Sequence, residues 1–180
     1  PYTLANMADD GAGLLDALGI AGAHIVGASM GGMIAQHFAA RHTQRTLSLT
    51  SIFSTTGNPK LPPARREAME VLIRRPASME EDALVEHGML LARTIGSPGY
   101  PADPQRLRAN VTANVRRSVY PEGPTRHLAA IVADGDRRAM LARIAAPTLV
   151  LHGEDDPLVR VEGGRDTAAA IPGARLSTIP

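Results

Sequence analysis

Cysteine is absent from this 180-residue sequence. Its absence excludes disulfides, thiolate metal sites and a cysteine nucleophile from these residues. An excess of charge of one sign is also missing, because 19 lysines and arginines are matched by 18 aspartates and glutamates, for a formal net charge of +1. With no basic block along the chain, we expect no nucleic-acid partner.

Long hydrophobic runs are missing as well. No apolar stretch approaches the ~18 residues needed to cross a bilayer, and no basic-then-apolar leader opens the chain. We therefore expect a cytoplasmic protein that does not enter a membrane. The sequence does have 44% hydrophobic side chains, which is enough for a real core. Its length fits one ordinary domain or a large piece of a bigger one.

Helical and strand patterns alternate at both ends of the chain. Residues 4–18 place apolar side chains on one helical stripe, with Thr3 as the N-cap and Gly19 as the stop. Strands are predicted at 24–27, 47–52, 147–151 and 174–180, and helices follow the first and third of them. This alternation predicts an α/β fold with a mostly parallel sheet flanked by helices.

The middle of the chain differs from both ends in its composition and pattern. Nine of the 14 prolines fall between Pro59 and Pro124 and separate amphipathic helical stretches. Ser78 with Glu81 three residues later predicts a capping box that opens one of these helices. We divide the chain into a core segment (1–54), a helical cap inserted between strands (55–143) and a second core segment (144–180).

Gly27-Ala28-Ser29-Met30-Gly31 is the sharpest chemical signal, because it joins a predicted strand to a predicted helix. A serine at so tight a bend exposes its oxygen and strains its own backbone. We expect Gly27 and Gly31 to crowd each other across the turn, which requires both to be glycine. The backbone N–H of Met30, at the start of the helix, would stabilise developing negative charge.

A second signal is the acidic segment that follows the strand at 147–151. A carboxylate at the carboxyl end of a parallel strand lies where such sheets gather their reactive groups. Glu154, Asp155 and Asp156 compete for this role. We choose Asp156, because Pro157 restricts it to an extended conformation, and we expect the other two acids to be solvated turn residues.

These two segments, Gly27–Gly32 with the following Gln36 and Ala146–Pro157, resemble the α/β-hydrolase fold family. The resemblance implies that Ser29 is the nucleophile and that Asp156 orients a catalytic histidine. Within the family the chain is most similar to aclacinomycin methylesterase-like hydrolases. The resemblance implies a partial α/β-hydrolase fold that acts on a small-molecule ester and needs no cofactor and no metal.

Two parts of the family pattern have no counterpart among these residues. The family places strands and an oxyanion-hole loop before the first helix, and its catalytic histidine after the last strand. We therefore expect the chain to be part of a longer protein, with that histidine beyond Pro180. The six histidines that are present are each expected to be surface or packing residues rather than the base.

The resulting prediction is a serine hydrolase that cleaves carboxylic esters of small to medium apolar substrates through an acyl-enzyme. The alternatives are another activity of the same fold (aminopeptidase, lactonase, C–C hydrolase or cofactor-free haloperoxidase) or a hydrolase-like scaffold that only binds. A serine rather than an aspartate at the bend argues against the dehalogenase and epoxide-hydrolase branches. We also expect these 180 residues alone to aggregate or dimerise through the free edge of the strand at 24–27.

Overall fold

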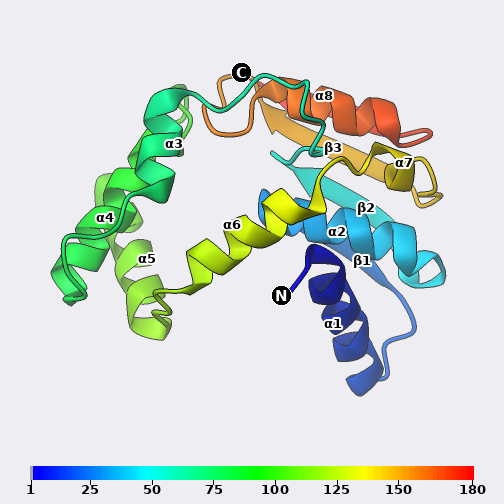
Figure 1. Cartoon of the computed structure of the whole chain (residues 1–180), viewed down its shortest axis with the longest axis horizontal. Helices are drawn as coiled ribbons and strands as arrows, with labels where there is room; N and C mark the ends of the chain where they lie inside the picture. Colours follow the sequence, from blue (N-terminus) through cyan, green and yellow to red (C-terminus); the bar gives the residue numbers. More distant parts are fainter. Residues whose placement is uncertain (1) are drawn as a thin grey trace.

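A four-stranded parallel sheet lies on one side of the molecule, and the helical insertion extends away from it (Figure 1). The computed structural model describes residues 2–180. The strands are β1 (Ala23–Ala28), β2 (Thr46–Ile52), β3 (Thr148–Gly153) and β4 (Arg175–Ile179), in the order β1-β2-β3-β4. The predicted α/β class with a mostly parallel sheet is thereby confirmed.

Eight α-helices accompany the sheet in the described part of the chain. They are α1 (Leu4–Ala17), α2 (Met30–Arg41), α3 (Arg66–Ile73), α4 (Glu81–Ile95), α5 (Pro104–Arg117), α6 (Gly123–Asp134), α7 (Arg138–Leu141) and α8 (Val161–Ala170), with a 3₁₀ turn, η1, at Thr43–Arg45. Helices α3 to α7 come between β2 and β3, so the predicted helical insertion between strands is also confirmed.

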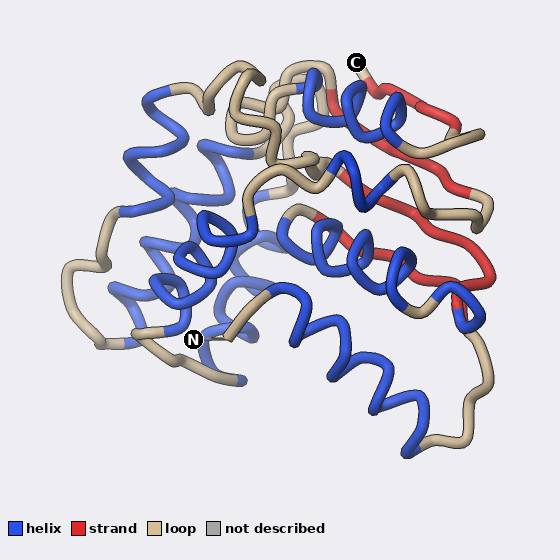
Figure 2. Tube along the Cα trace, turned by 45° about the vertical axis from the view of Figure 1, so that its right-hand side comes forward, coloured by secondary structure: helices blue, strands red, loops and turns tan. Residues whose placement is uncertain are grey.

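The helices that pack on the sheet cover one of its faces (Figure 2). Helix α2 packs on β1 and β2, α8 packs on β3 and β4, and α1 packs on α2. The main core is buried between these helices and the sheet; its buried members are Ala35, Ala39, Leu49, Leu141, Ile144, Ala146 and Ile171. On the opposite face Val26 is 63% exposed, which is unusual because parallel sheets are normally covered on both sides.

Strand register brings the carboxyl ends of all four strands to the same edge of the sheet. Ala28 pairs with Ile52, Ile52 pairs with Leu151, and Leu151 pairs with Ser177. The residues that follow these positions therefore emerge at one edge of the sheet, which is where open α/β sheets assemble their sites.

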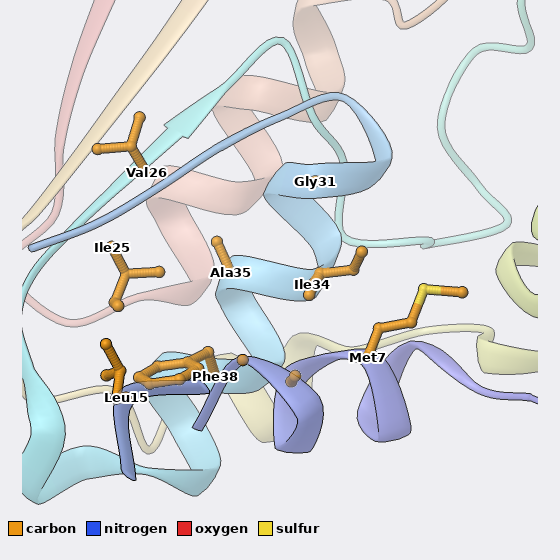
Figure 3. A pocket seen from close by; sticks show the side chains of 10 residues that line it. Met7, Leu15, Ile25, Val26, Gly31, Ile34, Ala35 and Phe38 are labelled. Carbon is orange, nitrogen blue, oxygen red and sulfur yellow. The ribbon is translucent and has the colours of Figure 1, made fainter. Parts of the chain in front are cut away.

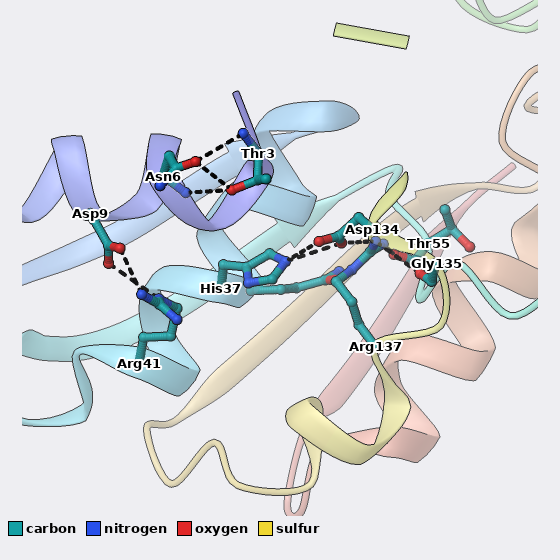
Figure 4. A network of polar contacts seen from close by, with 10 residues as sticks. Thr3, Asn6, Asp9, His37, Arg41, Thr55, Asp134, Gly135 and Arg137 are labelled. Atoms are coloured by element: carbon teal, nitrogen blue, oxygen red, sulfur yellow. Dashed lines mark hydrogen bonds and ion pairs between the residues drawn. The ribbon is translucent and has the colours of Figure 1, made fainter. Parts of the chain in front are cut away.

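Both ends of the helical insertion are fastened to α2 through buried Arg137 (Figure 4). Its guanidinium donates to Gln36 Oε1 at 3.1 Å, to Asp134 Oδ2 at 2.7 Å and to the Thr55 carbonyl at 2.6 Å. Asp134 also accepts from His37 Nε2 at 2.8 Å. Burial lowers the pKa of Arg137 below its usual value, and the Asp134 carboxylate opposes that effect.

One predicted helix start is wrong. Helix α4 begins at Glu81 after Glu80, and it has no side-chain cap. The Ser78 hydroxyl instead accepts a hydrogen bond from the Glu80 backbone N–H at 3.2 Å. Serine side chains often bond the backbone two residues on and so form a turn in place of a helix cap. The predicted N-cap of α1 is confirmed, because the Thr3 side chain accepts from the Asn6 backbone N–H in a capping box.

Candidate active site

Ser29 lies at the bend between β1 and α2 with a backbone conformation that L-residues rarely adopt. Its φ is 53° and its ψ is −121°. Its N–H donates to the Ile52 carbonyl at 2.9 Å, and its own carbonyl accepts from the buried Ser54 hydroxyl at 2.9 Å. The strain is therefore held from both sides by β2 and the residues that follow it.

Gly27 permits the bend through a very close backbone approach. A Cβ at this position would lie 2.0 Å from the Gly31 carbonyl oxygen. The reverse does not hold, because a Cβ on Gly31 would meet no heavy atom within 4 Å. The tight contact on the helix side is at Gly32, whose Cβ would lie 2.6 Å from Ser54 Cβ. The crowding argument thus applies to Gly27 and is wrong for Gly31.

Met30 is the first residue of α2 and directly follows Ser29. The first N–H groups of a helix have no partner within the helix. They also carry the positive end of the helix dipole. The N–H of Met30 is therefore suited to stabilise negative charge that develops beside the Ser29 hydroxyl.

Phe53 is a residue of this edge that the sequence analysis missed. Its φ is 35°, and in residues 2–180 Ser29 is the one other non-glycine residue with a positive φ. Phe53 follows Ile52, which pairs with Ala28, so Phe53 and Ser29 leave the sheet side by side. A bulky residue with positive φ is a genuine outlier, and such strain clusters at functional sites. No feature of the sequence signals this conformation.

Asp156 lies in the loop after β3, where its carboxylate is held by backbone groups. Oδ1 accepts hydrogen bonds from the N–H groups of Leu158 and Val159, both at 2.9 Å. Oδ2 accepts none of these bonds and lies 3.8 Å from His152 Nε2. One oxygen thus fixes the orientation of the carboxylate, and the other is left to accept from a further donor.

The two competing acids are placed differently. Glu154 accepts a hydrogen bond from the Thr178 hydroxyl at 2.7 Å, which ties it to β4. Asp155 is exposed and lines a cavity that faces the helical insertion. Asp156 is the acid of this segment whose carboxylate the backbone anchors.

His152 braces the loop that carries Asp156. Its ring is buried, and Nε2 donates to the Val159 carbonyl at 2.7 Å, which fixes the hydrogen on Nε2. The other ring nitrogen, Nδ1, is buried without a hydrogen-bond partner in the described residues. It rests against α8, where a Cβ on Gly164 would lie 2.5 Å from it. His152 is thus a buried packing residue, one of the two roles that the sequence predicts for it.

Within residues 2–180 no histidine ring forms a hydrogen bond with the Ser29 hydroxyl. Four rings have other partners, which are Ser48 for His24, Asp134 for His37, Asp9 for His42 and the Val159 carbonyl for His152. His87 and His127 lie in α4 and α6 of the insertion. The described residues therefore present a serine and an oriented carboxylate at one edge of the sheet.

The spacing of the strands fits a single ring between these two groups. Ser29 follows β1 and Asp156 follows β3, with β2 between them. Neighbouring strands lie about 4.8 Å apart, so β1 and β3 are about 10 Å apart. A separation of about 10 Å leaves room for one imidazole between a serine and a carboxylate at the ends of these strands.

Comparison with known proteins identifies the family of the chain. The family model described as the alpha/beta hydrolase fold matches residues 1–180. The chain belongs to the α/β-hydrolase family.

Three similar proteins show the range of this α/β-hydrolase's relatives. Rhodomycin D methylesterase DauP of Streptomyces sp. (strain C5) is 29% identical over 99% of this chain and 66% of its own length. A 2-hydroxy-6-oxononadienedioate/2-hydroxy-6-oxononatrienedioate hydrolase of Cupriavidus pinatubonensis is 32% identical over 91% of this chain and 56% of its own. The crystal structure of a hydrolase from Pseudomonas aeruginosa PA01 is 33% identical, with a TM-score of 0.69 over 100% of this chain and 64% of that one.

The chain thus spans between 56% and 66% of the length of these relatives. In the part of the α/β-hydrolase that the structure describes, no helix is long and apolar enough to cross a membrane. The same residues contain no group of three or more side chains suited to hold a metal ion.

Proposed function

We propose that this α/β-hydrolase cleaves carboxylic esters of small to medium apolar substrates through an acyl-enzyme. The observation that carries the proposal is the strained backbone of Ser29 at the strand–helix bend, two strands away from the backbone-anchored carboxylate of Asp156. The similarity to a methylesterase supports an ester as the substrate.

In the proposed reaction Ser29 Oγ attacks the carbonyl carbon of the ester. A histidine from the segment after Pro180 takes the serine proton, and Asp156 Oδ2 accepts the other ring N–H and stabilises the imidazolium. The Met30 N–H, with a donor from a loop ahead of these residues, holds the oxyanion. The imidazolium then returns the proton to the leaving alcohol, and water cleaves the acyl-serine by the same route.

The helices between β2 and β3 are assigned in this proposal to the cap, which shapes the acyl or alcohol pocket and excludes water. The cap is residues 55–143, and the two core segments are residues 1–54 and 144–180. The proposal needs neither a cofactor nor a metal, and its partner is a small-molecule ester.

The test is hydrolysis of p-nitrophenyl butyrate by the complete gene product. We expect Ser29→Ala to abolish turnover and Asp156→Asn to lower kcat by about 10⁴-fold, as loss of the orienting carboxylate does in other triads. A fluorophosphonate probe should label Ser29, as read by mass spectrometry of its peptide. Asp155→Asn serves as the matched control and should retain most of the activity. Equal losses in Asp155→Asn and Asp156→Asn would contradict the assignment of the acid.

A second candidate is a hydrolase that acts on another class of bond, as the similarity to the 2-hydroxy-6-oxononadienedioate hydrolase suggests. A panel of p-nitrophenyl esters, amino-acid anilides and a 2-hydroxy-6-oxo-dienoate separates the candidates, because each reports on one bond. Preferential turnover of the anilide or the dienoate would replace the esterase proposal. Absence of a histidine after β4 in the complete reading frame would favour a binding scaffold instead.

A further inference from the structure

A cavity of about 560 Å³ lies between the helical insertion and the loop that carries the acid. One wall comes from the end of α4, the segment after it and the start of α5, and the other comes from Asp155 and Pro157. The two walls are joined at Arg65, whose backbone N–H donates to the Pro157 carbonyl at 2.7 Å. A volume of this size is typical of small-molecule sites.

Two arginines of this cavity have free guanidinium groups. Arg65 and Arg93 line it, both are exposed, and neither forms an ion pair or a side-chain hydrogen bond in the described residues. Six other arginines of the insertion are engaged by acids: Arg66 with Glu70, Arg108 with Glu86, Arg116 with Glu81, Arg126 with Glu122, Arg137 with Asp134 and Arg138 with Asp136.

The charge of the cavity is therefore positive. Against the two guanidiniums stands one carboxylate, that of Asp155, which forms no ion pair in residues 2–180. A guanidinium binds carboxylate groups through two parallel N–H donors. Two guanidiniums and one carboxylate leave a net charge of +1, so one anionic group is enough to neutralise the cavity.

The remaining lining is mostly apolar and stiff. Four prolines, two alanines, Leu107 and the ring of Tyr100 contribute to it; the prolines are Pro98, Pro101, Pro104 and Pro157, and the alanines Ala92 and Ala102. Proline and tyrosine offer contact area at a low cost in conformational entropy. The cavity therefore combines two cationic side chains with a mostly apolar lining.

We propose that this cavity binds the free carboxylate arm of an amphipathic substrate, so that the preferred ester is a half ester of an apolar dicarboxylic acid. This inference deepens the proposed function and depends on it for the ester at the other end of the ligand. The carboxylate would be held by Arg65 and Arg93, and the apolar chain by the proline-rich wall.

The experiment measures binding apart from turnover. The complete gene product carrying Ser29→Ala is titrated with monomethyl suberate and with neutral dimethyl suberate by calorimetry at two salt concentrations. We expect a Kd at least about tenfold lower for the half ester, and weaker binding of that ligand at higher salt. Arg65→Gln and Arg93→Gln should each raise its Kd about three- to tenfold, since charge-assisted hydrogen bonds are lost.

Arg117→Gln is the matched control, because Arg117 lies at the end of α5, is exposed and does not line the cavity. Its Kd should equal that of the parent. Equal Kd values for the two esters, no binding of either, or the same loss in Arg117→Gln as in Arg93→Gln would each overturn the inference. If the enzyme with Ser29 intact then hydrolyses neutral esters, the proposed function stands without this cavity.

Discussion

Ser29 and Phe53 adopt positive φ angles, 53° and 35°, on adjacent strands at the same edge of the sheet. Backbone conformations that L-residues rarely adopt cost about 1–3 kcal/mol each. The protein holds the two conformations together through the Ser29 N–H bond to Ile52 and the Phe53 N–H bond to the Leu151 carbonyl at 2.7 Å. Stored strain of this kind is expected where a reactive group must be presented in a fixed direction.

The strain at Phe53 predicts that its glycine variant is more stable than its alanine variant, which is the reverse of the usual order in a strand. Phe53→Gly and Phe53→Ala both remove the ring, but glycine alone relieves the positive φ. We expect Phe53→Gly to be more stable than Phe53→Ala by about 1 kcal/mol in urea unfolding. Leu47 is the control, because its exposed strand position should show the ordinary order, with alanine the more stable by about 0.5–1 kcal/mol. If the alanine variant is the more stable one at Phe53 as well as at Leu47, Phe53 is not strained.

The contact between α8 and His152 predicts that substitution of Gly164 by alanine destabilises the protein. A methyl group on Gly164 would lie 2.5 Å from His152 Nδ1, so the ring must move and its bond to the Val159 carbonyl must weaken. We expect Gly164→Ala to lower the free energy of unfolding by about 1–3 kcal/mol. Gly13→Ala in α1, where the methyl group meets nothing within 4 Å, should instead stabilise by about 0.5–1 kcal/mol. Thermal unfolding of both variants checks that Gly164→Ala lowers the stability and Gly13→Ala raises it.

The burial of Arg137 predicts that its substitution by alanine lowers the stability far more than the same substitution at Arg138. Arg137→Ala leaves Asp134 and Gln36 without their buried partner, and we expect a loss of about 3–5 kcal/mol in stability. Arg138→Ala removes an exposed pair with Asp136 and should change the stability far less than Arg137→Ala does. Urea unfolding of the two variants provides the comparison. Losses of similar size would mean that Arg137 does not fasten the insertion to α2.

The lowered pKa of Asp136 predicts a contribution to the stability that is lost at acid pH. Hydrogen bonds from Arg138 lower the pKa of this carboxyl from 3.8 to about 2. Because the folded pKa is depressed, the stabilisation is present above pH 3.8 and is lost as the pH falls through about 2. We expect the Tm difference between the parent and Asp136→Asn to be small, since the pair is exposed, and to shrink as the pH falls from 4 to 2. A difference as large at pH 2 as at pH 4 would contradict this assignment.

The free edge and open face of the sheet predict self-association of a chain made of these 180 residues. Among the described residues β1 pairs with β2 alone, and Val26 is exposed on the face that no helix covers. Beside β1 an apolar cavity of about 210 Å³ opens between α1 and α2, with Phe38 and Ile34 in its wall (Figure 3). Unpaired edges and apolar patches of this kind template association.

We expect light scattering to show dimers or larger species for this chain, and Val26→Lys to reduce them. Val132→Lys is the control, because Val132 is 75% exposed on α6, away from the sheet, and it should leave the distribution unchanged. A monodisperse monomer of the parent chain would be inconsistent with a free edge at β1.

Local patterns were sufficient for most elements of the fold. The helical stripe after Thr3 is predicted from apolar spacing, because the amphipathic period reports directly on which face of the helix is buried. The start of α4 is not, since the Ser78 hydroxyl has two local ways to bond the backbone and the sequence pattern does not distinguish them.

The sequence by itself determined the α/β class, the tight bend at Ser29 and the acid-bearing loop, because each depends on residues close together in the chain. The tertiary structure alone decided which residues support them. The bond from Ser54 to the Ser29 carbonyl, the brace of His152 on the acid loop and the bond of Arg137 to Gln36, 101 residues away, depend on strand register and helix packing. No local pattern encodes these contacts, since they exist only once distant segments are brought to their final separation.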